Sequence, residues 1–499
     1  MKNRKQNSVK TPVTQAGGEK PPEANKINAS THYDFDGKNL TPYGGLLPVI
    51  TMLEKLGFPS LVEELLTMKR ATRVMSGSRF VLAIVLGIYV GFARLSHLRF
   101  IARDPLLTGI LEVAAIPAQS TLWRFLAALH ISVSRQLLKL QQKLRERVWA
   151  AANVRLKTIT VDTDTTVHTL YGNQMGARKS YNPKNKGKKS YQPILTFLAE
   201  TKEYVSGQLR NGDRPTGKQI ADHLREVFQS IPETAATLRA RADSGFYCWE
   251  AIEAYVRWKC RFVVVARKTA RLVAELRKAD WKPSPETNAD AQCEFRYRPD
   301  GWESEFRFVA LRYDEDEEEA AAAAEKKRKR KKKPGKQEPA EQYQLFQCGK
   351  VKYRVFVTNI EDQPVAEVTE FYSGRASAEN LIKEANNDAG LAAHPSGRFD
   401  MNANHFQMTM LAYNLNCWLL LFQRNEEESA ATLKHTMLAT SRLRFLFVAA
   451  KIWRHSGRTG ISYGDHYEEK GLFNRLMNRL RGIVLPGRGF APVIGVALE

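Results

Sequence analysis

Three carboxylates are placed so that they could bind a metal ion together. Asp162 ends an expected strand in "TVDTDTT", Asp243 follows another strand in "RADSGFY", and Glu379 lies on an expected helix in "FYSGRASAENLIKEANND". Strand-end carboxylates converge when their strands are neighbours, and a helix beside them supplies the third group. Clustered carboxylates repel one another, and a divalent cation is their natural counter-ion. The pattern predicts a site for two Mg²⁺ or Mn²⁺ ions that activates water or a 3′-hydroxyl against a phosphodiester.

The first strand leaves a choice between two aspartates. Asp162 and Asp164 have the same parity on a strand and therefore face the same side. We favour Asp162 because it directly follows the apolar run, and we keep Asp164 as the alternative metal ligand. Glu384 competes with Glu379, but it lies five residues further along and points to a different face of the helix.

The expected helix after residue 370 carries four polar side chains on one face. Tyr372, Arg375, Glu379 and Lys383 are spaced i, i+3, i+7 and i+11, which aligns them along a single helix. One interpretation is a solvated face with ordinary ion pairs. The other is a catalytic carboxylate held among side chains that bind phosphate.

The elements that must position these groups follow from periodicity. Strand patterns at "VRLKTITVD", "YQPILTFLAE" and "EYVSGQLRNG" precede an amphipathic helix that Thr216 caps and Pro232 ends. The strand "LRARADSG", the helix "YCWEAIEAYVRWK" and the strand "RFVVVAR" follow. This β-β-β-α-β-α-β order predicts a mixed sheet with helices packed against it.

Changes in composition divide the chain into segments. A segment with an acidic block, an alanine run and the basic run Lys326 to Lys333 cannot bury enough apolar surface to form a domain, so we expect a solvated loop. The predicted segments are a disordered tail 1–30, a helical domain 31–152, the first part of an α/β core 153–268, a β-rich insertion 269–370 with the charged loop 314–342, a helical second part of the core 371–454 and a basic C-terminal region 455–499.

The N-terminal region is helical by pattern. The stretch from "PAQSTLWRFL" onward predicts one long amphipathic helix with Ser120 or Thr121 as its N-cap. The most apolar run, "FVLAIVLGIYVGFA" from Phe80 to Ala93, is too short to span a membrane and predicts a buried core helix. The region fits a DNA-binding domain and a dimerisation or scaffold domain about equally well, since no specific helix-turn-helix signature stands out.

The charge balance indicates a polyanionic partner. The 499 residues contain 76 Lys and Arg against 53 Asp and Glu, a formal net charge of +23. The five cysteines are scattered without CxxC spacing, which argues against a structural zinc site and favours a reducing cytoplasm. The polar N-terminus lacks the apolar segment of a secretory signal. We expect a cytoplasmic protein that binds nucleic acid and no membrane.

Two further features could contact DNA. The loop "YNPKNKGKKSY" holds Lys184, Lys186, Lys188 and Lys189 between aromatic residues, beside the first carboxylates, and we expect it to bind backbone phosphates. Trp249 follows the second carboxylate. It either stacks on an unpaired base or fills the core side of its amphipathic helix.

With these pieces together, the chain resembles the bacterial insertion-sequence transposases of the group-1 branch of the DDE superfamily, which have an RNase H-like catalytic core. The resemblance covers roughly residues 154–420, including "VDTDTTVHTLYG", "KSYNPKNKGKKSYQPILTFLAET", "RADSGFY" and "AYNLNCWLL". It implies a DNA transposase that cleaves transposon ends at terminal inverted repeats and transfers the strand into target DNA. It further implies at least a homodimer in the synaptic complex and a place at the bacterial nucleoid.

The family's helix signature, Y-x2-R-x3-E-x6-K, is matched at three of its four positions. Tyr372, Arg375 and Glu379 match, and Asn386 stands at the lysine position. The resemblance implies that Arg375 contacts a phosphate and that Tyr372 positions the scissile strand, while Lys383 is a candidate substitute for the lysine. A nuclease without strand transfer and a non-catalytic DNA-binding relative are the alternative functions.

Overall fold

The computed structural model divides the chain into two units, Met1–Lys38 and Asn39–Glu499, and all described helices and strands lie in the second. The predicted tail 1–30 and the predicted charged loop 314–342 lie almost entirely outside the described residues. The described residues are 25, 27–68, 75–180, 182–183, 185–232, 236–314, 346–348, 351–425 and 428–484.

A mixed sheet carries the candidate site. Its core consists of β2 (Thr158–Thr165), β5 (Ile194–Leu198), β6 (Tyr204–Gln208), β7 (Thr237–Ala242) and β8 (Arg261–Val265). They neighbour one another in the order β6-β5-β2-β7-β8, with β2 antiparallel to β5 and parallel to β7. The predicted mixed α/β fold with RNase H-like order is confirmed, and its first and fourth strands are neighbours as expected.

The insertion continues this sheet. β13 pairs antiparallel with β8, and β11, β10 and β9 follow it outward, while β12 pairs with β13. The sequence predicts antiparallel strands here, and the pairing shows that they extend the core sheet. These elements are α9 (Ala270–Lys278), β9 (Lys282–Pro283), β10 (Ala291–Tyr297), β11 (Phe306–Asp314), β12 (Phe346–Cys348) and β13 (Val351–Thr358).

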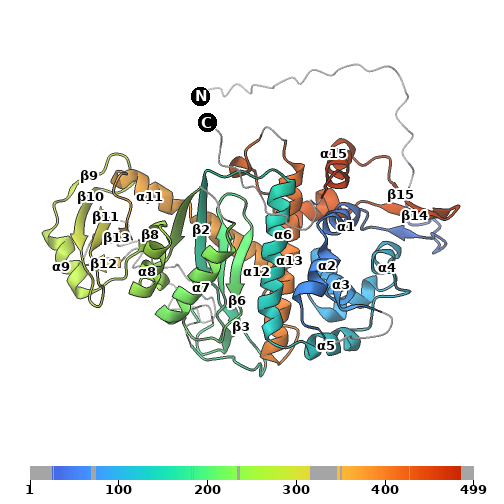
Figure 1. Ribbon diagram of the computed structural model, residues 1–499, viewed down its shortest axis with the longest axis horizontal. Coiled ribbons are helices and arrows are strands. Elements are labelled where there is room, and N and C mark those ends of the chain that lie inside the picture. The colour runs from blue at the N-terminus through green and yellow to red at the C-terminus, as the bar shows by residue number, and fades with distance from the viewer. Residues whose placement is uncertain are drawn as a thin grey trace, which may run out of the picture. The chain divides into compact units, whose positions relative to one another are not determined.

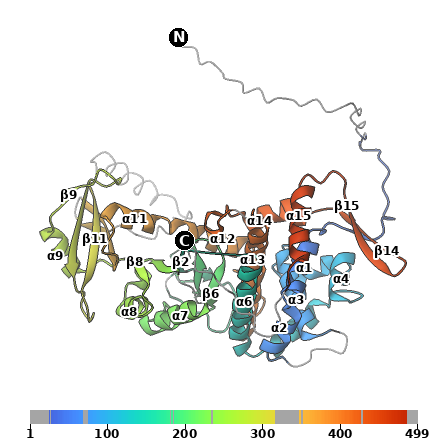
Figure 2. The same ribbon diagram turned by 45° about the horizontal axis from the view of Figure 1, so that its top comes forward.

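Helices cover both faces of the sheet. α7 (Gly217–Ser230) and α8 (Trp249–Arg257) lie on one face, and α11 (Val365–Ser373) and α12 (Ala376–Asn387) lie on the other (Figure 2). Thr216 caps α7 in a capping box with Gln219, which confirms the predicted start of that helix.

The single helix expected after residue 370 is wrong, because the chain breaks between α11 and α12. The Phe371 carbonyl accepts a hydrogen bond from Arg241 Nη1 at 2.8 Å. The amide of Arg375 donates to the carbonyl of Tyr372, and not to that of Phe371 as in a continuous α-helix. Gly374 occupies the break, since a Cβ there would lie 2.2 Å from Arg241 Nη1. Tyr372 and Glu379 therefore belong to different helices.

The long helix expected from residue 120 is also divided, into α5 (Gln119–Ala128) and α6 (Ser132–Ala151). Ala118, not Ser120 or Thr121, is the N-cap residue of α5. At the break, the side-chain amide of Asn404 donates to the carbonyls of Leu129 and His130. The region before α5 contains α1 (Leu46–Lys55), α2 (Phe58–Leu65), α3 (Gly77–Tyr89) and α4 (Pro105–Leu111).

The apolar stretch of α3 is buried, as predicted. Among the described residues, no helix is long and apolar enough to cross a membrane.

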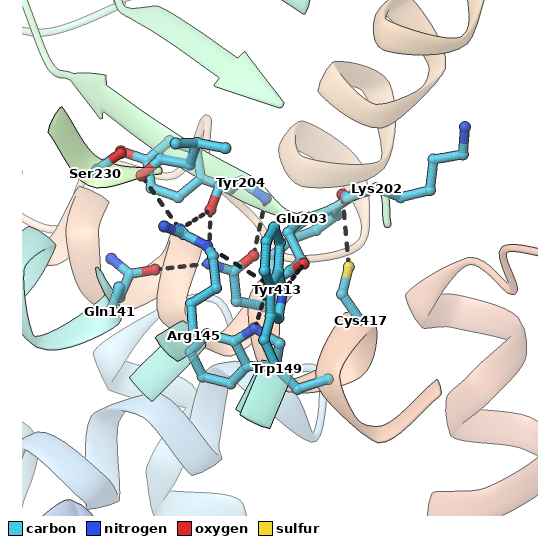
Figure 3. A network of polar contacts seen from close by, with 12 residues as sticks. Gln141, Arg145, Trp149, Lys202, Glu203, Tyr204, Ser230, Tyr413 and Cys417 are labelled. Carbon is cyan, nitrogen blue, oxygen red and sulfur yellow. Dashed lines mark hydrogen bonds and ion pairs between the residues drawn. The ribbon is translucent and has the colours of Figure 1, made fainter. Parts of the chain in front are cut away.

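A central helix pair joins the sheet to the N-terminal helices. α13 (Phe399–Gln423) is buried along nearly its whole length and stands beside α6 (Figure 1). A buried carboxylate lies where these helices meet the sheet: Glu203 accepts from Trp149 Nε1 at 2.9 Å and Trp418 Nε1 at 2.7 Å, and lies 3.5 Å from Arg145 Nε (Figure 3). Both oxygens of Glu203 are thus used to hold α6 and α13 against the start of β6.

The chain after α13 has more structure than its weak sequence pattern indicates. It contains α14 (Leu438–Ser441), β14 (Ala450–His455), β15 (Arg458–Tyr463) and α15 (Lys470–Arg481). β1 (Leu40–Thr41) pairs with β14, so the two ends of the described second unit meet in a three-stranded sheet.

The substitution Glu203→Gln is expected to lower the free energy of unfolding by about 3–5 kcal/mol, because it leaves Arg145 buried without a carboxylate. The amide nitrogen of the glutamine would also face an indole N–H donor. Urea denaturation followed by circular dichroism measures the loss. The control Glu253→Gln, at an exposed position of α8, is expected to change stability by less than about 0.5 kcal/mol. Equal stability of both variants would contradict the assigned role of Glu203.

Candidate active site

β2 presents both aspartates on one face, as their parity predicts. Thr163, between them, points to the opposite face, where its hydroxyl lies 2.9 Å from that of Thr196. Asp162 and Asp164 are 1% and 3% exposed. Two buried carboxylates on one strand face each require compensation, because an unpaired buried charge is costly.

Asp162 is fully engaged by Arg241. The two residues lie directly opposite each other on β2 and β7. Arg241 Nε and Nη2 each donate to one oxygen of Asp162 at 2.7 Å, and Nη1 donates to the Phe371 carbonyl. This bidentate pair ties the sheet to α11. In the structure this ion pair occupies both oxygens of Asp162, the residue that the sequence analysis favours as the first metal ligand.

Asp164 lies two residues after Asp162 on β2, and its contacts differ from those of Asp162. Its Oδ1 accepts from the amide of Thr165 at 2.7 Å, and its Oδ2 lies 2.7 Å from Arg375 Nη2. Arg375 Nη1 lies 3.5 Å from Glu379 Oε1. Arg375 therefore bridges the β2 carboxylate and the carboxylate on α12.

Three carboxylates that are distant in the sequence influence one another's charge in the folded protein. The pKa of Asp164 is raised to about 7, mainly by burial; the Arg375 guanidinium opposes this rise, and the negative charges of Asp243 and Glu379 add to it. Like charges act this way only when they are close. Asp164 therefore lies within electrostatic reach of both Asp243 and Glu379.

Asp243 and Glu379 are more accessible than Asp164. Asp243 directly follows β7, and its Oδ1 accepts from the amide of Gly245 at 2.9 Å. The side chain of Glu379 is 39% exposed. Asp164 thus forms the floor of the site, and the other two carboxylates form its solvent-facing side.

The donor set suits a hard divalent cation, since it offers carboxylate oxygens that repel one another. In the described part of the chain, however, no three acidic, histidine or cysteine side chains already enclose a metal position. Arg375 lies at Asp164 and Glu379, where a cation would balance the charge. Asp164, Asp243 and Glu379 would therefore hold a metal only after Arg375 moves.

Tyr372 and Arg375 are buried, and neither can touch DNA as placed. Tyr372 packs its ring 4.8 Å from that of Phe356, and burial raises its pKa to about 12. Its hydroxyl has no hydrogen-bond partner within the described residues. Lys383, by contrast, is exposed on α12. The DNA contacts expected of Tyr372 and Arg375 therefore need a rearrangement that exposes them.

The remaining predicted contacts differ in accessibility. Lys186, Lys188 and Lys189 are exposed, while Lys184 lies outside the described residues. Trp249 is half-buried, with its ring 6.0 Å from that of Trp302 and 6.4 Å from that of Phe306. These contacts correspond to the core alternative for Trp249, which packs α8 against the insertion.

Sequence reasoning missed a histidine pair beside the site. His168, on the short strand β3 (His168–Thr169), has Nε2 2.9 Å from Asn386 Oδ1 and Nδ1 3.2 Å from His394 Nε2. Asn386 Nδ2 also donates to the hydroxyl of Thr166. Asn386, at the family's lysine position, thus anchors α12 to the loop after β2. Neither histidine has ligand-like spacing, so no sequence signal marks the pair.

Comparisons with known proteins identify relatives of the chain. A family model described as "Transposase DDE domain group 1" matches residues 24–326 and 338–484. No curated protein matches. Among solved structures, a piggyBac transposase synaptic complex with hairpin DNA is similar with a TM-score of 0.40 and 10% identity, over 90% of this chain and 88% of that chain. That structural similarity is distant.

Replacing Asp162 with alanine is expected to lower the free energy of unfolding by about 3–5 kcal/mol, because Arg241 stays buried without its carboxylate. Chemical denaturation measures the change. Asp222→Ala removes one partner of an exposed ion pair with Arg225 and serves as the control, with an expected loss below about 1 kcal/mol. A loss that small for Asp162→Ala would contradict the structural role of the pair.

Stability is expected to fall as the pH drops from about 6.5 towards 4. Burial lowers the pKa of His168 to about 4 and that of His394 to about 2. Below the unfolded value near 6.5, the unfolded chain binds protons that the folded chain does not, so acid favours unfolding.

The variant His168→Gln is therefore expected to reduce this dependence by up to about 1.4 kcal/mol per pH unit. Denaturation at a series of pH values measures it. His466→Gln, at an exposed ring, is the control and should leave the slope unchanged. Identical slopes for wild type and His168→Gln would rule out a buried neutral His168.

Proposed function

Because the chain belongs to the group 1 family of DDE transposases, we propose that Asp164, Asp243 and Glu379 are its catalytic triad. The protein is a DNA transposase, and its family cleaves and joins DNA with divalent metal ions. The observation that carries the proposal is the contact of Arg375 with both Asp164 and Glu379, and the influence of Asp243 on the raised pKa of Asp164 places Asp243 near them. Asp162 has both oxygens bound by Arg241 and is assigned a structural role.

Two Mg²⁺ or Mn²⁺ ions held by the triad would activate the attacking water or 3′-hydroxyl and stabilise the leaving oxygen. The chain's own residues supply the rest. Asp164 offers a ligand from the sheet, because its backbone pairs there with Leu195 of β5. Asp243 and Glu379 approach from the solvent side, where DNA can enter.

Arg375 has two roles in this account. In the structure it balances the charge of Asp164 and Glu379. Once displaced from them, its planar donor fork suits a phosphate of the bound DNA equally well. The same movement would expose the hydroxyl of Tyr372, which lacks a hydrogen-bond partner within the described residues, so that it can position the scissile strand.

The substrate is proposed to be the terminal inverted repeats of a mobile element, followed by target DNA. Two ends must be held together, so the working form is at least a homodimer. Lys186, Lys188 and Lys189 would bind backbone phosphates near β2. Lys383 would take the phosphate contact of the family's lysine, because Asn386 is engaged with His168 and Thr166.

The substitutions Asp164→Asn, Asp243→Asn and Glu379→Gln are each expected to lower Mg²⁺-dependent cleavage at the element's ends by at least roughly 10²–10³-fold, since each removes several kcal/mol of charge stabilisation. A cleavage assay on end-containing duplexes measures the rate. A gel-shift assay checks that binding of the ends is retained.

Asp162→Asn is the matched control, assayed well below its unfolding temperature. It is expected to keep cleavage within about tenfold of wild type, since Asp162 contacts Arg241 and no substrate. An inactive but folded Asp162→Asn together with an active Asp164→Asn would reverse the assignment.

A further inference from the structure

The β14–β15 hairpin carries a cationic surface remote from the carboxylate site. Lys451, Arg454 and Arg458 are exposed, and Trp453 between them is 43% exposed. Both views show the hairpin extending beyond α1 and α4, away from β2 (Figures 1 and 2). Neither the catalytic chemistry nor the core of the fold uses these side chains.

The hairpin is a rigid arm. Its turn is made by Ser456 and Gly457 with φ of 48° and 75°. Positive φ at both positions is what a two-residue type I′ turn requires, and that turn fixes the register of the strands. At its base, the Tyr463 hydroxyl donates to Gly44 O at 3.1 Å, and the Tyr463 ring lies 5.1 Å from that of Phe473 on α15.

The pleat gives the arm an inner and an outer face. Ile452 lies opposite Ile461, and both pack against the hydrophobic core. Lys451, Trp453 and His455 alternate with Ile452 and therefore lie on the outer face. Arg458 lies opposite His455 and joins them there. Arg454 has the parity of Ile452, so it belongs to the inner face, but it is exposed next to the turn at the tip of the arm.

Trp453 forms a fixed apolar surface in the middle of this outer face. It lies opposite Gly460, and a Cβ on Gly460 would come within 2.0 Å of the indole. The ring thus lies across the neighbouring strand, where only glycine leaves room for it. The ring therefore offers an apolar surface among cations, against which the sugars of a DNA backbone can pack.

The cations of the arm are not neutralised. Among the described residues, the ion pairs include none formed by Lys451, Arg454 or Arg458, whereas Arg444 nearby in sequence pairs with Glu469. Three free positive charges on a projecting arm attract a polyanion, and their long side chains can adapt to its phosphates.

We propose that the outer face and tip of the β14–β15 hairpin bind the backbone of duplex DNA, as a second DNA contact apart from the catalytic site. Lys451 and Arg458 bind phosphates from the outer face, Arg454 reaches a phosphate from the tip, and Trp453 packs against the sugars. The contact positions DNA without reading its sequence, because phosphates carry no sequence information. This assignment rests on the proposed function, which supplies the DNA.

The test compares the full-length protein with the variant Lys451→Ser/Arg454→Ser/Arg458→Ser. Binding of a duplex oligonucleotide of arbitrary sequence is measured by fluorescence anisotropy at several salt concentrations. Each lost phosphate contact lowers the slope of log K against log salt by about 0.9. The expected result is a slope lower by about 2–3 units, with the same loss of affinity for every sequence.

Two further variants define the contact. Trp453→Ala is expected to weaken binding without changing the salt slope.

The matched control Arg257→Ser/Arg277→Ser/Lys282→Ser removes the same charge from exposed positions on α8, α9 and β9, and it is expected to keep the wild-type slope. Thermal unfolding verifies the fold, and should the triple variant unfold, Arg458→Ser beside the turn is expected to lower the slope by about 1.

An unchanged slope in a folded hairpin variant, with wild type binding normally, overturns this assignment and leaves the proposed function intact. An equal loss in the control variant also overturns it, because the effect would then belong to net charge. Failure of the wild-type protein to bind any duplex would overturn the proposed function as well.

Discussion

The burial of two negative charges on one face of β2 is the constraint on which the site depends. Asp162 and Asp164 are both removed from water, and each must find a positive partner. Arg241, on the neighbouring strand, forms an ion pair with Asp162. Arg375, at the break between two helices, forms an ion pair with Asp164. These two pairs determine how α11 and α12 lie on the sheet.

The two pairs differ in how firmly they are held. Arg241 binds both oxygens of Asp162 and a main-chain carbonyl, so all three of its nitrogens are committed. Asp164 shares its partner with Glu379 and is opposed by Asp243. A pair surrounded by competing carboxylates is the one that a divalent cation can replace. In our proposal the Asp162 pair therefore stays in place and the Asp164 pair is the one that exchanges, although the two aspartates stand only two residues apart.

The order of core elements could be predicted because it rests on local signals. Strand periodicity, the Thr216 cap and the apolar run of α3 each act over a few residues. What failed depends on distant contacts. The break before α12 arises because Arg241, 130 residues earlier in the chain, donates a hydrogen bond to the Phe371 carbonyl. The sequence also could not show that Arg241, 79 residues further along the chain, binds Asp162. The turn residues Ser456 and Gly457 did give a local signal for the hairpin, but the weak pattern around them hid it.

The central claim is that Asp164, and not Asp162, belongs to the metal site. The most direct measurement is Mn²⁺ binding, followed by loss of the free-ion electron paramagnetic resonance signal, for Asp164→Asn and Asp162→Asn under conditions where both are folded. The account predicts that Asp164→Asn loses binding and that Asp162→Asn binds Mn²⁺ like the wild-type protein. Retained binding by Asp164→Asn, with loss in Asp162→Asn, would contradict it.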